Sequence, residues 1–159
     1  MSTYTKLADR TVYTAEDALE WALETSQEHG SVNVGGVPLT LEPVARFGDL
    51  EAVQAYVDRV TTHPGVIAEF GPSKVTVRKR QTGHAAHYQN NVIAIHPERG
   101  RDLMTELTIL HELAHHYSKG HGHGPRFAAV EIALLGLIVG PQVSLALRIL
   151  FDQHEVPTS

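Results

Sequence analysis

A cluster of histidines is the most distinctive chemical feature of the sequence. The chain contains eleven histidines among 159 residues, and eight of them fall between residues 84 and 123. Within this stretch the sequence HELAH places His111 and His115 four residues apart, with Glu112 directly after the first of them. In an α-helix, residues four apart lie about 40° from each other around the axis. Both imidazoles can therefore face one metal ion.

The position of Glu112 suits a catalytic base. On the same helix it lies about 60° from His115, so its carboxylate can reach a water molecule on the metal without binding the metal itself. Zinc in such a site acts as a Lewis acid and lowers the pKa of the water, while the carboxylate accepts the proton and returns it to the leaving group. The pattern therefore predicts hydrolysis with Zn²⁺ as cofactor, with His111 and His115 as metal ligands and Glu112 as base.

The residues around this motif predict a helix that begins after Asp102 and continues to about residue 118. Its apolar side chains form two stripes, Leu103, Leu107, Leu110 and Ala114 in one, and Ile109 and Leu113 in the other. We expect the helix to be buried. Two imidazoles and a carboxylate without partners in a core would cost on the order of several kcal/mol, which zinc coordination offsets. The alternative is a surface helix on which these residues are incidental.

The residues after the motif suggest a third ligand, which a catalytic zinc ion usually needs. The sequence HELAHH, a short loop, and then HGPRF, which begins at His123, resembles the SprT-like zincin metallopeptidases. In that group H-E-x-x-H is followed by H-G-x-x-F at the start of the next helix. The sequence is closer still to a family of actinobacterial proteins of this size that are assigned as metallohydrolases. The resemblance covers about residues 84–140.

This resemblance implies a zincin-like fold and makes residues 1–159 a single metallohydrolase domain. Carried over position by position, it makes His111, His115 and His123 the zinc ligands and Glu112 the base. It also implies that extended substrate binds along the edge of the strand before the helix, near residues 92–96. SprT-like proteases that act on DNA-bound proteins usually carry a zinc ribbon or a basic tail, and this chain has neither.

Two other residues compete with His123 for the third position. His121 lies ten residues after His111, the metzincin spacing, but Ser118 stands where a metzincin has glycine, and no methionine follows the motif. Glu131 is a more distant candidate, because a carboxylate from the next helix completes the gluzincin type of site. Its spacing of sixteen residues from His115 is short for that type. Glu131 is otherwise a solvated residue or a group that orients a ligand imidazole.

Other polar residues near the motif have weaker functional interpretations. His116 should point away from the ion, as a histidine with its own hydrogen-bond partners. Tyr88 and Tyr117 could donate a hydrogen bond to an oxyanion, although buried tyrosines more often only pack. The histidines at 84, 87 and 96 are expected at the surface of a hairpin.

The elements expected to position the site form an α+β fold with a small antiparallel or mixed sheet. Helices are predicted over residues 15–29 after a Thr14 cap, from an Asp49 cap to residue 62, and over residues 125–140 and 141–154. A loop is expected over residues 64–72. Strands are predicted within residues 74–80, 84–89 and 92–96, the last two joined by a turn at Asn90 and Asn91.

Composition limits the function classes. The chain has no cysteine, which excludes disulfides and cysteine zinc ligands, and its formal net charge is −5, which does not favour nucleic-acid binding. The one basic cluster, Lys74, Arg78, Lys79 and Arg80, is more typical of an edge strand protected against aggregation. No membrane segment or secretion signal is predicted, so we expect a cytoplasmic protein that acts on a peptide or protein substrate.

Two alternatives to a general peptidase stay open. The chain could be a regulatory protease that cuts a DNA-associated protein partner, with the basic cluster helping to dock it. It could instead be a non-catalytic binding module that zinc only stabilises. Glu112 argues against the second alternative, because a structural zinc site does not need it.

Overall fold

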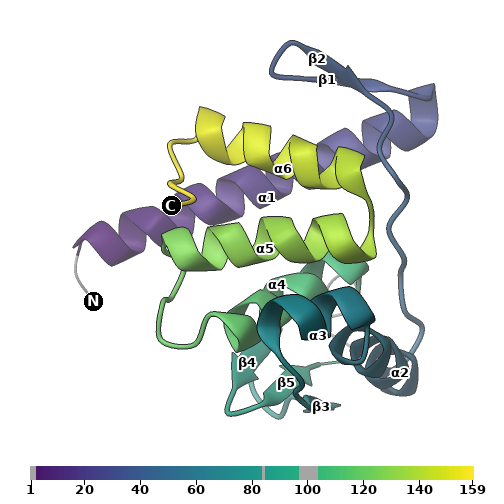
Figure 1. Cartoon of the computed structure of the whole chain (residues 1–159), viewed down its shortest axis with the longest axis vertical. Coiled ribbons are helices and arrows are strands. Elements are labelled where there is room, and N and C mark those ends of the chain that lie inside the picture. Colours follow the sequence, from purple (N-terminus) through teal and green to yellow (C-terminus); the bar gives the residue numbers. More distant parts are fainter. Residues whose placement is uncertain (1–2, 84, 97–103) are drawn as a thin grey trace. The chain divides into compact units, whose positions relative to one another are not determined.

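A computed structural model describes residues 3–83, 85–96 and 104–159 of the chain (Figure 1). The fold is α+β, as the sequence predicts. The chain divides into two compact units, a terminal unit of Met1–Pro43 with Ser118–Ser159 and a central unit of Val44–Tyr117. The grouping of all 159 residues into one domain stays a prediction. Among the helices of the described residues, none has both the length and the apolar character that a membrane span requires.

The terminal unit is mainly helical. Its elements are α1 (Thr3–His29), β1 (Val32–Val34), β2 (Val37–Leu39), α5 (Pro125–Ile138) and α6 (Pro141–Gln153). Helix α6 packs against both α1 and α5, and β1 and β2 form an antiparallel hairpin (Figure 1). The predicted starts of the last two helices at Pro125 and Pro141 are confirmed, because proline suits the first turn of a helix.

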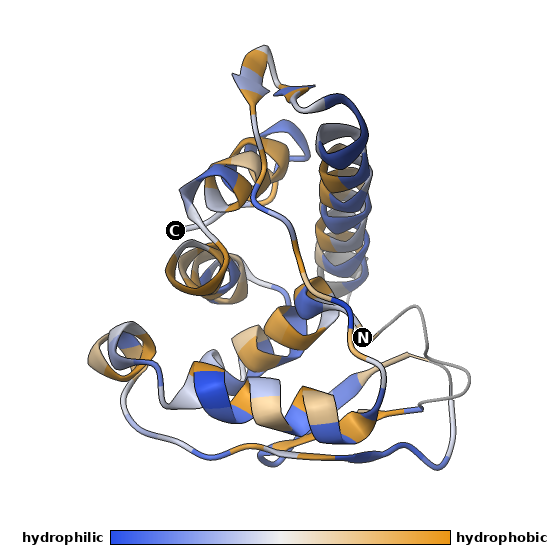
Figure 2. Cartoon of the chain, turned by 90° about the vertical axis from the view of Figure 1, so that its right-hand side faces the viewer, coloured by the Kyte–Doolittle hydropathy of each residue, from blue (hydrophilic) through white to orange (hydrophobic). Residues whose placement is uncertain are grey.

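Helix α1 is longer than predicted, and its predicted start at Thr14 is wrong. The Thr14 hydroxyl donates to the Arg10 carbonyl at 2.8 Å, so this threonine bonds back within the helix and does not cap it. Val12, Ala15 and Leu19 continue the buried side of the helix across that position. In Figure 2 the ribbon of α1 alternates between hydrophilic and hydrophobic residues, as expected of an amphipathic helix.

The central unit combines helices with a small mixed sheet. Its elements are α2 (Leu50–Thr61), α3 (Pro64–Phe70), β3 (Thr76–Lys79), β4 (His87–Gln89), β5 (Val92–Ile95) and α4 (Glu106–Tyr117). The strand order is β3-β5-β4, with β5 parallel to β3 and antiparallel to β4. Asn90 and Asn91 have φ of 49° and 64°, which confirms the predicted tight turn between β4 and β5.

Two features of the helices in this unit bear on the predictions. Asp49 is the predicted N-cap of α2, and its carboxylate accepts a hydrogen bond from the Ala52 N–H at 2.8 Å. The prediction of a loop over residues 64–72 is wrong, because a short helix, α3, occupies most of this segment. His63 caps this helix by accepting from the Gly65 N–H at 3.0 Å, and Pro64 occupies the first turn.

Helix α4 carries the HELAH motif and begins later than predicted. Asp102 and Leu103 lie outside the described residues. Thr105 forms a β-bridge with Arg46, and its hydroxyl accepts from the Thr108 N–H at 3.3 Å, so α4 begins at Glu106. The predicted burial of the helix is confirmed for Ile109, Leu110, Leu113 and Ala114, which are fully buried, while Leu107 is half-buried.

The sheet corrects the expected position of the substrate strand. Strand β5 is central, and each residue of Val92–Ile95 is in register with β3, while Val92, Ile93 and Ala94 are also in register with β4. An extended peptide therefore cannot pair along residues 92–95, and the outer strands are β3 and β4. The exposed Arg78 and Lys79 lie on β3, which confirms that part of the basic cluster is on an edge strand.

Candidate metal centre

The central unit brings His111 and His115 together one turn apart on α4. Their ring centroids are 5.0 Å apart at an interplanar angle of 75°, and a ligand nitrogen of one lies within 4.8 Å of a ligand nitrogen of the other. Two nitrogens on one tetrahedral zinc ion lie about 3.3 Å apart, given Zn–N bonds of about 2.0–2.1 Å. The helix thus presents a two-imidazole donor set that fits zinc.

Glu112 is buried next to this pair. Burial raises the pKa of its carboxyl, while the neighbouring His111, Arg80 and the backbone N–H of Tyr88 act to lower it. A divalent cation bound beside the carboxyl would also lower its pKa. The Tyr88 backbone N–H donates a hydrogen bond to this carboxylate, and its effect on the pKa is the smallest of the three.

The β4–β5 register explains why this N–H is available. Pairs along an antiparallel ladder alternate between hydrogen-bonded and non-hydrogen-bonded. Gln89 and Val92 flank the two-residue turn as its closing pair, so Tyr88 and Ile93 form the next, non-hydrogen-bonded pair. The backbone N–H and C=O of Tyr88 therefore point away from β5. The outer edge of β4 is in this way directed toward Glu112.

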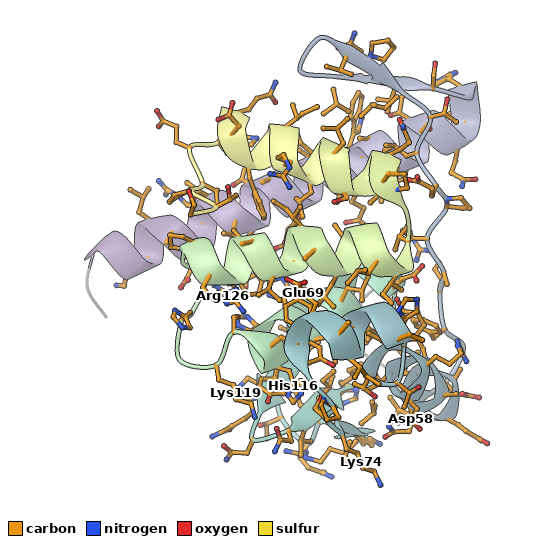
Figure 3. The ribbon with its side chains drawn as sticks, in the orientation of Figure 1. Asp58, Glu69, Lys74, His116, Lys119 and Arg126 are labelled. Carbon is orange, nitrogen blue, oxygen red and sulfur yellow. The ribbon has the colours of Figure 1, made fainter. Side chains whose placement is uncertain are left out.

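His116 has the expected role of a histidine with its own partners. The Nδ1 atom of His116, the residue labelled in Figure 3, is 2.8 Å from a hydroxyl oxygen. This hydroxyl belongs to Tyr88, and the His116 Nε2 is 2.9 Å from the Ser73 hydroxyl. The Ser73 hydroxyl in turn donates to the Tyr117 hydroxyl at 3.2 Å. Both tyrosine hydroxyls suggested for an oxyanion are thus engaged in this network. Tyr88 acts on Glu112 through its backbone.

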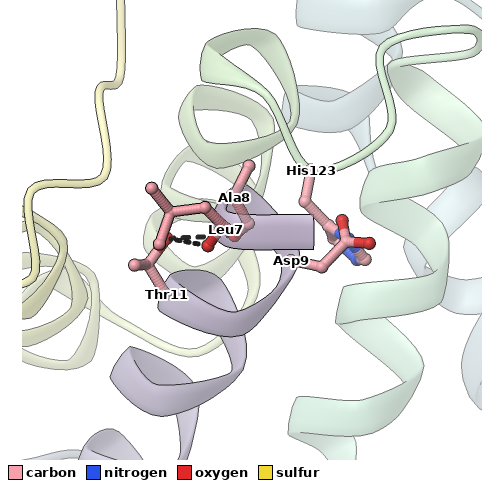
Figure 4. Close-up of polar contacts among 5 residues, drawn as sticks. All are labelled: Leu7, Ala8, Asp9, Thr11 and His123. Carbon is pink, nitrogen blue, oxygen red and sulfur yellow. Dashed lines mark hydrogen bonds and ion pairs between the residues drawn. The ribbon is translucent and has the colours of Figure 1, made fainter. Parts of the chain in front are cut away.

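His123 belongs to the terminal unit, where its ring is closely surrounded. Its side chain is 10% exposed, and its Nδ1 lies 2.7 Å from the Asp9 carboxylate on α1 (Figure 4). The rings of Tyr13 and Phe127 meet the imidazole edge to face at centroid distances of 5.1 and 4.8 Å. Sequence reasoning missed Asp9, because it placed this part of the chain outside any helix.

The other two candidates for the third ligand, His121 and Glu131, differ in how exposed they are. His121 is exposed, in contrast to His123. Glu131 is only 3% exposed, so its interpretation as a solvated residue is wrong. Carboxylate oxygens of Glu131 and of Glu16 on α1 lie within 4.8 Å of each other. Of the hairpin histidines, the one at 84 lies outside the described residues, and His87 is exposed as expected.

The central unit therefore holds the buried His111 and Glu112 and the half-buried His115 on one helix, while Asp9 holds His123 in the terminal unit. Two imidazoles beside a carboxylate are the donors and the base that metal-assisted hydrolysis requires. No protein-family model matches the chain, and comparisons with curated proteins and with solved structures gave no significant match.

Proposed function

We propose that the protein is a zinc-dependent metallohydrolase with a zincin-like fold, and that it cleaves peptide bonds. The observation that carries this proposal is the α4 cluster, in which the rings of His111 and His115 lie 5.0 Å apart and Glu112 is buried beside them. A buried acid between two imidazoles is costly in a core that lacks a compensating ion. A bound metal ion best explains why this acid lies beside two imidazoles on one helix.

His123 is the proposed third ligand. It follows Tyr117, the last residue of α4, by six residues, and a chain of that length spans at most about 20 Å. Its Nδ1 is held by the Asp9 carboxylate, so Nε2 is the nitrogen that a metal ion would meet. A carboxylate on the second ring nitrogen is the usual companion of a histidine ligand. His121 is exposed, which makes it the weaker candidate.

Glu112 performs the proton transfers in this proposal. Zinc, when bound, supplies Lewis acidity that polarises the scissile carbonyl and makes water more acidic. The Glu112 carboxylate accepts the proton from the attacking water and delivers it to the leaving amine as the C–N bond breaks. The Tyr88 N–H orients the carboxylate during both transfers, and the surrounding apolar residues of α4 limit access of bulk water.

The outer edge of β4 is the proposed place for an extended substrate. An edge strand carries backbone N–H and C=O groups that can pair with an added strand. Of the two outward backbone groups of Tyr88 on β4, the N–H donates to Glu112, and the C=O can accept from an added strand. A peptide paired there would bring a backbone carbonyl close to the base.

The test is a comparison of Glu112→Gln, His115→Ala and wild type on unfolded proteins and peptide libraries. We expect Glu112→Gln to keep zinc and lose at least about 100-fold in hydrolysis, the usual contribution of a general base. His115→Ala should lose both zinc and activity. The matched control is Glu51→Gln, an exposed position on α2, which should behave as wild type. Equal hydrolysis by Glu112→Gln and wild type would refute the catalytic assignment, and zinc binding without hydrolysis would favour a non-catalytic module.

A further inference from the structure

We propose that Asp9 is a positioning residue for the third zinc ligand, so that the first helix of the chain sets the metal affinity of the site. The inference rests on the proposed function, because it assumes that His123 binds zinc. Asp9 itself would not touch the ion. Its role is to fix the tautomer and the orientation of the His123 ring.

The hydrogen bond determines which ring nitrogen is presented. Asp9 Oδ1 lies 2.7 Å from His123 Nδ1, and the two side chains are 27% and 10% exposed (Figure 4). An ionised carboxylate can only accept, so the proton resides on Nδ1 and the lone pair on Nε2. The interaction thus selects the tautomer that can coordinate a metal through Nε2.

Two aromatic rings confine the imidazole in addition. Tyr13 lies one turn after Asp9 on the same side of α1, and its ring centroid is 5.1 Å from that of His123. Phe127, in the first turn of α5, meets the imidazole almost perpendicularly at 4.8 Å and 89°. The ring is therefore held by one charge-assisted hydrogen bond and two edge contacts, which leaves it little rotational freedom.

A carboxylate behind a histidine ligand has a measurable effect on metal binding. Removing such a partner typically weakens metal affinity about 10–100-fold, because the free ring samples the wrong tautomer and other orientations. Tyr13 and Phe127 would still surround the ring after Asp9 is replaced. The expected effect is therefore weaker zinc binding with the fold intact.

The experiment measures zinc affinity by competition with a chelator for the full-length wild type, Asp9→Asn and Asp9→Glu. We expect Asp9→Asn to bind zinc about 10–100-fold more weakly and Asp9→Glu to recover part of the loss. Asp17→Asn, an exposed acid on the same helix, is the matched control and should bind as wild type. Circular dichroism of the zinc-free proteins should show unchanged helix content. Zinc affinity of Asp9→Asn within twofold of wild type would overturn the proposal.

A second readout does not need the metal. In the zinc-free wild type at about pH 8, where a histidine is normally neutral, ¹⁵N NMR of the His123 ring should show the proton on Nδ1. In Asp9→Asn this preference should be reduced, and an unchanged spectrum would overturn the inference. A wild type that binds no zinc would refute the proposed function and the positioning role with it. Zinc binding that is unaffected in Asp9→Asn would refute the positioning role alone.

Discussion

Glu106, the first residue of α4, is a buried carboxylate that ties this helix to the rest of the central unit. Its Oε1 accepts from the Ala45 N–H at 2.9 Å, and its Oε2 accepts from the Tyr56 hydroxyl at 2.6 Å. Burial and the adjacent Glu106 carboxylate raise the pKa of Tyr56, which keeps the phenol protonated as the donor. Because α4 carries His111 and His115, these bonds also help to position the two proposed metal ligands.

Replacing this residue should therefore destabilise the protein. Glu106→Ala leaves the buried Tyr56 hydroxyl and the part-buried Ala45 N–H without their acceptor. We expect the free energy of unfolding in urea to fall by about 1–3 kcal/mol. Tyr56→Phe removes only one of the two hydrogen bonds and should lower the free energy of unfolding by less. Glu51→Ala, at an exposed position on α2, should change it by less than about 0.5 kcal/mol. If Glu106→Ala proved as stable as Glu51→Ala, the bonding of this carboxylate would not matter for folding.

At the residue scale, the sequence reveals chemistry that depends on local spacing. The geometry of a helix fixes the angle between His111 and His115, and the structure places their rings 5.0 Å apart as that angle predicts. The Asp9–His123 contact joins residues 114 positions apart, so tertiary packing alone determines it. The same is true of Tyr88, whose backbone N–H reaches Glu112 because of the register of a hairpin.

At the scale of elements, helix α6 shows how a distant residue can cap a helix. The Glu42 carboxylate accepts from the backbone N–H groups of Gln142 and Val143 at 2.9 and 2.8 Å. These N–H groups have no partner within the helix, and a negative charge at a helix N-terminus is favourable. The preceding Gly140 leaves room for this, since a Cβ there would collide with the Glu42 side chain.

Glu42→Ala should destabilise the terminal unit, because it removes the side chain that caps α6. We expect the free energy of unfolding to fall by about 1–2 kcal/mol, the range for losing a side-chain cap and its charge. Gly140→Ala should have a similar effect, because it displaces the carboxylate and adds strain at a φ of 157°. Glu20→Ala, at an exposed position on α1, is the control. A Glu42→Ala protein with wild-type stability would show that the cap contributes nothing.

Element prediction succeeded where a residue acts within its own segment. Asp49, Pro125 and Pro141 each mark a helix start, and Asn90 with Asn91 forms the turn, since these types have local conformational preferences. It failed at Thr14, whose hydroxyl bonds back to a carbonyl one turn earlier. The central place of β5 was also not predictable, because strand order depends on pairing with β3 across the chain.

At the scale of the whole molecule, the composition and the pattern of elements were enough to predict the α+β class. The division into two units could not be predicted, because the terminal unit is assembled from both ends of the sequence. A metal that binds only the folded protein stabilises it by mass action. The proposed zinc site would therefore couple metal content to the stability of the entire chain.

The most direct test of this account is the zinc content of the purified, folded protein after exposure to zinc and removal of excess metal. We predict about one zinc ion per chain for wild type and for His87→Ala, which removes an exposed imidazole, and almost none for His115→Ala. Folding should be followed on the same samples by circular dichroism. A folded wild type without stoichiometric zinc, or a His115→Ala protein that retains as much zinc as wild type, would contradict the account.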